Sequence, residues 1–127
     1  MSDTPLHWLT VSALSRRIHD GSLSPVTLME HLLDRAEALN PALGAFQLIP
    51  RAMALDAARA SELSLRSGYD AGPLHGIPFA AKDIIDVRGL ATTAGSNALL
   101  DNIAVQDATV VDQLRRAGMV LLGKTRT

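Results

Sequence analysis

Cysteine is absent from the 127 residues, and its absence removes several kinds of chemistry. Without thiols the chain can form no disulfide, hold no zinc through cysteine and use no cysteine nucleophile. Aromatic residues are also scarce, at 3% of the sequence, although hydrophobic residues as a whole reach 47%. A core must therefore be built mainly from leucine, valine, isoleucine and alanine. That hydrophobic content is typical of a folded domain.

Positive charge is not in excess either, since the formal net charge is -1. A chain without a basic field is not expected to bind nucleic acid as its primary partner. No apolar run of about 18 residues occurs, so we predict no membrane span. The first eight residues include an acidic side chain and no apolar segment, so we predict no signal peptide. The expected location is the cytoplasm.

Metal and cofactor sites are not predicted. The four histidines lack the spacing of metal ligands, and no His-Glu pair falls on one helical face as it does in zinc proteases. His75 lies in a glycine- and proline-rich turn, where a turn residue is the simpler interpretation than a catalyst. We therefore expect no cofactor and no metal.

Residues 1–70 predict a mainly helical layer. Apolar residues at helical spacing indicate a helix over residues 10–20, with Thr10 as its N-cap. Ser24, followed by a proline, starts a second helix, which we expect to stop at Asn40 and Pro41. Residues 45–49 alternate weakly, as a short strand would. Residues 51–67 are rich in good helix formers.

Residues 71–127 predict the start of an α/β core. Residues 77–81 and 119–122 are apolar throughout, which favours strands buried on both faces. Between them we predict a helix capped by Asp107, with Val110, Leu114 and Ala117 as its apolar stripe. Strand, helix and strand in this order predict parallel pairing. We interpret residues 1–127 as part of one domain, whose sheet needs further strands to be complete.

Lys82 is the most unusual placement in the sequence. It directly follows the apolar segment 77–81 and precedes Asp83. An ammonium group that loses hydration is pushed toward its neutral form, and a neutral amine can act as a general base. The alternative is that Lys82 extends to solvent at the end of the strand, or pairs with Asp83 or Asp86. Spacing alone leaves both open.

A second lysine, Lys124, lies in a segment that matches a nucleotide-binding motif in sequence but not in expected structure. Residues 118–125 match the phosphate-loop pattern G-x-x-x-x-G-K-[ST] at every position. A phosphate loop needs its central residues to turn backbone N–H groups toward the ligand, whereas Met-Val-Leu-Leu favours a strand. We therefore predict no nucleotide site. Lys124 is expected to be a structural residue, or a contact to segments beyond this chain.

Three blocks of sequence resemble the amidase signature family. Residues 72–83 are similar to that family's "GPL-x-GIP-x-x-x-KD" segment, and residues 89–96 to its "G-x-x-T-T-x-GS" loop. Residues 107–125 resemble its "DAT-V-V-x-x-L-x-x-AG-x-x-x-x-GKT" segment. Residues 12–25 also fit its N-terminal pattern. The blocks occur in the family's order and cover almost the whole chain.

The resemblance implies a large mixed sheet covered by helices, and catalysis by a Ser–cis-Ser–Lys triad. Lys82 matches the family's catalytic lysine. The two serines and the glycine-rich oxyanion loop lie downstream of "GKT" in the family, and no such segment occurs in these 127 residues. Ser96 is better interpreted as a turn residue than as a substitute nucleophile. We therefore expect residues 1–127 alone to be inactive.

Three functions remain open on this basis. The first is a stand-alone amidase that acts on a small-molecule amide. The second is the glutamine-hydrolysing subunit of a tRNA-dependent amidotransferase, which shares these blocks. The residues after Lys82 and after "GKT" depart from the pattern common in those subunits, which favours the first. The third is a truncated, non-catalytic amidase-like product. Neither the substrate nor the oligomeric state follows from the sequence.

Overall fold

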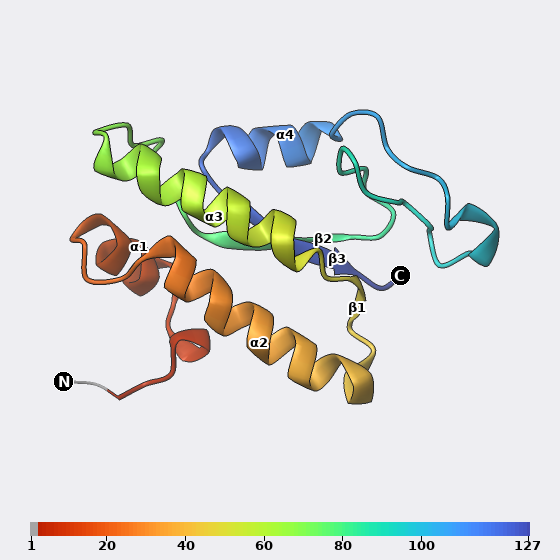
Figure 1. Ribbon diagram of the computed structural model, residues 1–127, viewed down its shortest axis with the longest axis horizontal. Coiled ribbons are helices and arrows are strands. Elements are labelled where there is room, and N and C mark those ends of the chain that lie inside the picture. Colours follow the sequence, from red (N-terminus) through yellow and green to blue (C-terminus); the bar gives the residue numbers. More distant parts are fainter. Residues whose placement is uncertain (1–2) are drawn as a thin grey trace.

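The computed structural model describes residues 3–127; Met1 and Ser2, part of the segment in which we predict no signal peptide, lie outside that range. Three strands form one sheet with helices on both faces (Figure 1). The elements in chain order are η1 (Leu6–Trp8), α1 (Val11–His19), α2 (Pro25–Leu43), β1 (Phe46–Leu48), α3 (Arg51–Arg66), β2 (Pro78–Lys82), η2 (Asn97–Leu99), α4 (Thr109–Arg116) and β3 (Val120–Thr125).

The sheet has the order β1-β3-β2, so β3 is its central strand. β2 and β3 are parallel and are joined through α4, which confirms the predicted strand–helix–strand unit. β1 pairs antiparallel with the end of β3. The prediction that residues 77–81 form a strand buried on both faces is wrong for the described residues. β2 lies at the sheet edge, and Ala80 is exposed there.

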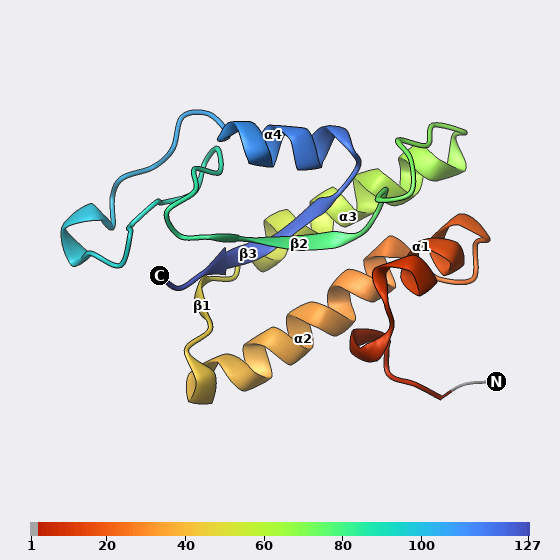
Figure 2. The same cartoon turned by 180° about the vertical axis from the view of Figure 1, so that it is seen from behind.

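Two apolar clusters cover the two faces of β3. α2 and α3 pack on one face through a cluster that holds Met29, Leu33, Ala54, Ala58, Val120 and Leu122. On the other face, Leu121 packs with Val111 of α4 and Ala81 of β2. The alternation along β3 follows from strand geometry, because successive side chains point to opposite faces. Figure 2 shows the strands from the side opposite to α3.

The N-terminal helices begin at the residues that the sequence predicts. The Thr10 hydroxyl oxygen accepts a hydrogen bond from the Ala13 N–H at 3.1 Å, and Ser24 caps α2 in the same manner. A third apolar cluster joins α1 to α2 through Leu14, Ile18 and Leu28. Ile77, just before β2, completes this cluster. The helical layer is therefore packed against the start of the α/β core.

α2 does not stop at Asn40 and Pro41, as we predicted. It continues to Leu43, with Pro41 inside its last turn and Gly44 as a left-handed C-cap at φ 59°. Proline this close to the end removes only one helical hydrogen bond. The Asn40 side chain exchanges two hydrogen bonds with the Phe46 backbone, at 2.7 and 3.1 Å. These bonds set the turn from α2 into β1, so asparagine orients the exit from the helix instead of ending it.

The first residue of the predicted α4 stripe is wrong, although Leu114 and Ala117 are partly buried. Val111 is buried at 1% exposure, whereas Val110 is 47% exposed. Asp107 does not cap the helix, because the N-cap residue is Ala108 and no side chain makes a capping hydrogen bond there. Asp107 instead accepts a hydrogen bond from the Arg88 backbone N–H and pairs with Arg115 at 2.9 Å. It fixes the loop before α4, which a helix-only pattern cannot reveal.

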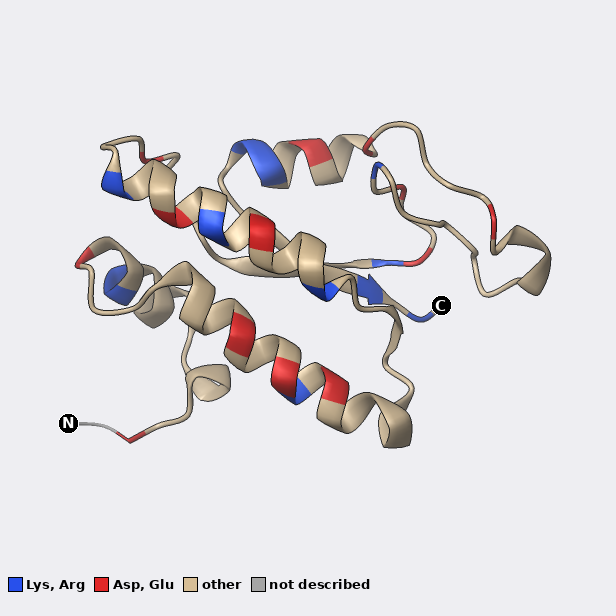
Figure 3. Ribbon diagram, in the orientation of Figure 1, with Lys and Arg blue, Asp and Glu red and all other residues tan. Residues whose placement is uncertain are grey.

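Charged side chains are spread over the outer faces of the helices (Figure 3). Acidic and basic residues alternate along α3, whereas α2 carries mostly acidic ones, and pairs such as Arg51–Asp34, at 2.8 Å, join the two helices. Among residues 3–127 no helix is both long and apolar enough to cross a membrane.

Candidate functional site at the carboxyl ends of β2 and β3

Lys82 lies where the two parallel strands end. In the pairing register it stands opposite Thr125, the last residue of β3. The backbone on either side is held firmly, because the Asp83 N–H donates to the Thr125 carbonyl at 2.8 Å and the Ile85 N–H donates to the Lys82 carbonyl at 2.9 Å. The position of Lys82 is therefore set by main-chain bonds on both sides.

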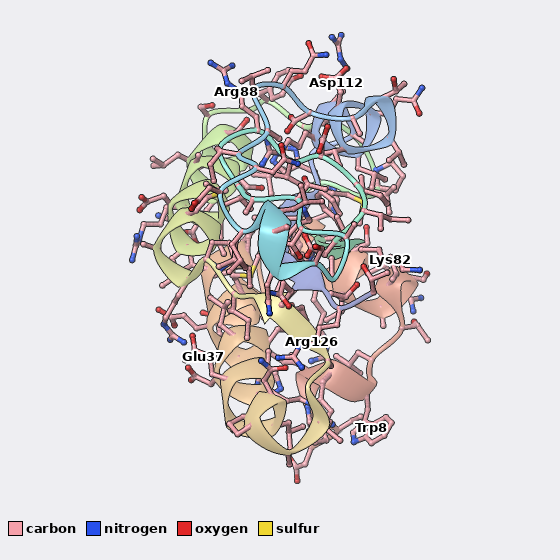
Figure 4. The ribbon with its side chains drawn as sticks, turned by 90° about the vertical axis from the view of Figure 1, so that its right-hand side faces the viewer. Trp8, Glu37, Lys82, Arg88, Asp112 and Arg126 are labelled. Atoms are coloured by element: carbon pink, nitrogen blue, oxygen red, sulfur yellow. The ribbon has the colours of Figure 1, made fainter. Side chains whose placement is uncertain are left out.

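The Lys82 side chain extends from this fixed backbone into solvent. Figure 4 shows it at the periphery, directed away from the body of the molecule. It is exposed, and within residues 3–127 its amine has no hydrogen-bond or ion-pair partner. The loss of hydration expected from the preceding apolar residues is thus not present in this part of the chain. Extension to solvent is one form of the alternative that the sequence left open, and the structure shows it; the other form, pairing with Asp83 or Asp86, is not found within residues 3–127.

Lys124 has the opposite environment. Its side chain is 0% exposed and its amine lies 3.2 Å from a carboxylate oxygen of Asp83, itself 2% exposed. The same amine donates to the Ala91 carbonyl at 3.1 Å and lies 3.4 Å from the Thr92 hydroxyl. A buried ammonium needs such a set of partners to offset its lost hydration. The expectation of a structural role for Lys124 is confirmed.

Asp83 completes the network from the other side. Besides Lys124, its carboxylate accepts hydrogen bonds from the Thr93 N–H at 3.2 Å and from the Thr93 hydroxyl. Burial raises the pKa of Asp83, but the Thr93 hydrogen bonds and the Lys124 charge outweigh it, so the pKa lies below its usual value. No local pattern in the sequence indicates that the partner of Asp83 is Lys124, far along the chain.

The loop over residues 91–96 is folded back onto this network. The Ala94 N–H donates to the Asp83 carbonyl at 2.9 Å, and Ala94 adopts a positive φ of 49°. The Thr92 hydroxyl donates to Asp86 at 2.7 Å. The second bond gives Asp86 a place at the outer side of the network, with Thr92 and not Lys82 as its partner. The threonines of the loop therefore connect the two aspartates to Lys124.

Ser96 and His75 are turn residues, as predicted. The Ser96 hydroxyl accepts from the Ala98 N–H at 3.3 Å and caps the short helix η2. His75 is buried, and its ring bridges the Ala71 N–H and the Ser61 carbonyl. Neither side chain contacts Lys82. Ser96 is therefore not arranged as a nucleophile for that lysine.

The segment that matches a phosphate loop is a strand, as the residues Met-Val-Leu-Leu predict. Residues 120–125 form β3, and no loop of N–H groups surrounds a ligand position. Gly118 ends α4 with φ 88°, and a Cβ there would lie 2.8 Å from the His75 Cα. The glycine is needed for helix termination and close packing, not for phosphate.

Ser15, His19 and Asp70 form a cluster that sequence analysis missed. His19 contacts the Ser15 carbonyl at 2.7 Å and Asp70 at 3.1 Å. The Ser15 hydroxyl donates to the Pro73 carbonyl, so it is not free to act as a nucleophile. Its hydrogen bond to Ser15, opposed by burial and aided by Asp70, raises the pKa of His19 above its usual value. The cluster is a clamp between α1 and the loop before β2.

Helices on both faces of a sheet, with polar side chains gathered at the carboxyl ends of parallel strands, define an α/β protein of the kind that places its site at those ends. The family model described as "Amidase" matches residues 27–127. The chain belongs to the amidase signature family.

The chain is similar to several curated proteins and solved structures of that family. It is 39% identical to an acylamidase of Rhodococcus erythropolis over 127 residues, which are 100% of this chain and 27% of the relative. It is 47% identical over 116 residues to a glutamyl-tRNA(Gln) amidotransferase subunit from Azoarcus sp., covering 91% and 24%. The peptide amidase structure from Stenotrophomonas maltophilia matches with TM-score 0.88 and 41% identity, covering 95% and 25%.

This chain therefore spans about a quarter of the length of the relatives that it matches. The whole sheet that the resemblance implies is larger than the three strands described.

Proposed function

We propose that residues 1–127 are the N-terminal part of a single amidase domain, and that the whole enzyme hydrolyses carboxamide C–N bonds with Lys82 as its general base. Within this part, residues 1–70 form the helical layer and residues 71–127 begin the α/β core. The observation that carries the proposal is the state of Lys82. Its backbone is held by a bond from its neighbour Asp83 to β3 and by a bond within the turn after β2, while its amine is unpaired within residues 3–127.

The chemistry follows from what a neutral lysine can do. In the Ser–cis-Ser–Lys scheme that the resemblance implies, the amine accepts a proton, through the cis-serine, from the serine that attacks the amide carbonyl. An acyl-enzyme forms and ammonia or an amine leaves; water then releases the acid. Both serines and the oxyanion donors belong to segments outside this chain. Residues 1–127 supply the base, and need no cofactor.

A stand-alone amidase acting on a small-molecule amide is the version that we favour. The relatives include an acylamidase and a peptide amidase, but also amidotransferase subunits of comparable identity. Similarity therefore does not separate the two. The preference rests on the residues after the Lys-Asp pair, Ile-Ile-Asp-Val, and on Arg126 and Thr127 after "GKT". We keep the cytoplasmic location expected from the sequence.

The test uses the full-length enzyme encoded by the reading frame that contains this chain. We expect ammonia or amine release from simple amides, and a loss of roughly 10⁴-fold or more in turnover for Lys82→Ala, as for other members of a catalytic triad. Lys82→Arg should be as inactive, since a guanidinium stays charged at any usable pH. Arg88→Ala, which removes an exposed cation from the loop after β2, is the control and should be fully active.

Two results would overturn the proposal. One is near-normal turnover by Lys82→Arg, because a residue that never loses its proton cannot be the base. The other is amide hydrolysis by residues 1–127 alone. The amidotransferase alternative gains support if the full-length protein releases ammonia only from glutamine, and only when other subunits are added.

A further inference from the structure

The residue next to Lys82 holds the most heavily bonded side chain at the end of the sheet. Asp83 faces inward while Lys82 faces outward, as neighbours in a strand do. The Asp83 carboxylate meets Lys124 from β3 and Thr93 from the loop over residues 91–96. Its N–H and carbonyl are bonded as well, to Thr125 and Ala94. Every polar group of Asp83 is therefore engaged, either by β3 or by this loop.

This arrangement determines where Lys82 can be. The peptide unit between Lys82 and Asp83 is tied to β3 on one side, and Asp83 is tied to the loop on the other. A shift of the Lys82 backbone would break several bonds at once. Main-chain pairing alone would also hold an ordinary strand end, but it would not require two buried charges. Apolar residues of similar volume often replace a buried ion pair at no cost in stability.

The proposal rests on the function proposed above. We propose that Asp83, Lys124 and Thr93 form a charge-compensated positioning network, which fixes the backbone of Lys82 and cancels the charge of the neighbouring carboxylate so that the Lys82 amine can be neutral. Lys82 is the group that exchanges the proton. The three network residues act through it and do not touch the substrate.

The charge balance carries the second half of the argument. A lone carboxylate one residue from Lys82 would stabilise the ammonium form, which is the wrong form for a base. The Lys124 amine, 3.2 Å from that carboxylate, supplies an equal and opposite charge. The other charged groups at this end are Asp86, bonded to Thr92, and Arg126, both exposed. Residues 91–96 bring no charge, so Lys124 is the buried counter-charge.

The measurement is the pH at which Lys82 becomes half-reactive toward acetic anhydride, followed by mass spectrometry in the full-length enzyme. Labelling reports the neutral amine directly and does not depend on turnover. The variants are Lys124→Met, Asp83→Asn and the double variant that carries both. Asp112→Asn and Arg116→Met are the matched controls, because they make the same charge changes in an exposed pair on α4. The acidic limb of the pH profile of kcat/KM is recorded in parallel.

We expect the two single variants to move the Lys82 midpoint in opposite directions. Lys124→Met leaves the Asp83 carboxylate uncompensated and should raise the midpoint by about one pH unit, for charges roughly 10 Å apart at an effective dielectric constant near 20. Asp83→Asn leaves Lys124 uncompensated and should lower it by a similar amount. The double variant should return to the wild-type midpoint, and the controls should not move it. The kcat/KM limb should follow the labelling midpoint.

Identical midpoints in wild type and in both single variants would overturn the proposal and leave a purely structural ion pair. Shifts in the same direction would overturn it as well. If Lys124→Met does not fold, Asp83→Asn and the double variant still distinguish the positioning network from a purely structural ion pair. If the proposed function is wrong, the Lys82→Ala enzyme remains active. The labelling experiment does not depend on that activity, so the two failures can be distinguished.

Discussion

The face of the sheet that α2 and α3 cover differs in chemistry from the carboxyl end of β2 and β3. Along the face covered by α2 and α3, the packing is wholly apolar, and Leu33 and Ala54 there are 0% exposed. At the carboxyl end of β2 and β3, the most buried side chains are Lys124 and Asp83. Apolar packing stabilises a fold without specifying a site. Buried charges are costly unless fully paired, and the positioning network that we propose would account for their presence at this end.

The largest expected effect is at the polar end. Removing one member of a buried ion pair leaves the other charge without compensation, which costs ~3–5 kcal/mol in other proteins. Lys124→Met should therefore lower the free energy of unfolding of the full-length enzyme by about that amount. Adding Asp83→Asn should recover most of the loss. Chemical denaturation measures both, and equal losses in the single and double variants would contradict a specific pair.

The apolar face should respond to cavities instead. Leu33→Ala removes a fully buried side chain of α2, and such changes cost ~2–5 kcal/mol. Leu43→Ala, at the end of the same helix but 68% exposed, is the control and should change the free energy of unfolding by less than ~0.5 kcal/mol. The same denaturation experiment applies. Similar losses in both variants would mean that α2 is not packed as described.

The smallest effect belongs to the clamp between α1 and the loop before β2. The pKa of His19 lies above its ordinary value of 6.5, so the folded state binds the proton more tightly than the unfolded state. The clamp therefore contributes stability that is fully present below that ordinary value. It is lost as the pH rises through the higher pKa of the folded state.

Thermal melts of wild type and His19→Gln across this window give the check. The wild-type melting temperature should fall toward that of the variant as the pH rises from below the ordinary pKa of histidine to above the raised pKa of His19. The exposure of Asp70, at 48%, keeps the effect small through solvent screening. A difference between the two proteins that grows with pH would contradict the assigned sign.

Sequence patterns predicted the elements and their pairing well, because these depend on local signals. Thr10 and Ser24 are capping residues at the positions where helices begin, and Gly118 ends α4. Errors arose where tertiary contacts outweigh local preference. Asn40 and Pro41 resemble a helix stop, yet the Asn40 side chain bonds the Phe46 backbone and the helix runs on.

The site was predictable only in part, for a related reason. Lys82 was selected by its place after an apolar strand and by the family blocks around it, and its role as the base stays a prediction. The pairing of Asp83 with Lys124 could not, because it depends on the register of two strands and on the fold of the loop that carries Thr93. The sequence predicted a structural role for Lys124 but not its partners. Its burial becomes apparent only once β3 is seen to be the central strand.

The most direct test of the central claim is chemical rescue of the full-length Lys82→Ala enzyme. The rate of amide hydrolysis is measured while small primary amines are added over a range of pH. If Lys82 is the base, the rate should rise in proportion to the concentration of neutral amine, and guanidinium should give no rescue. A Lys82→Ala enzyme that hydrolyses amides at close to the wild-type rate without any added amine would contradict the account.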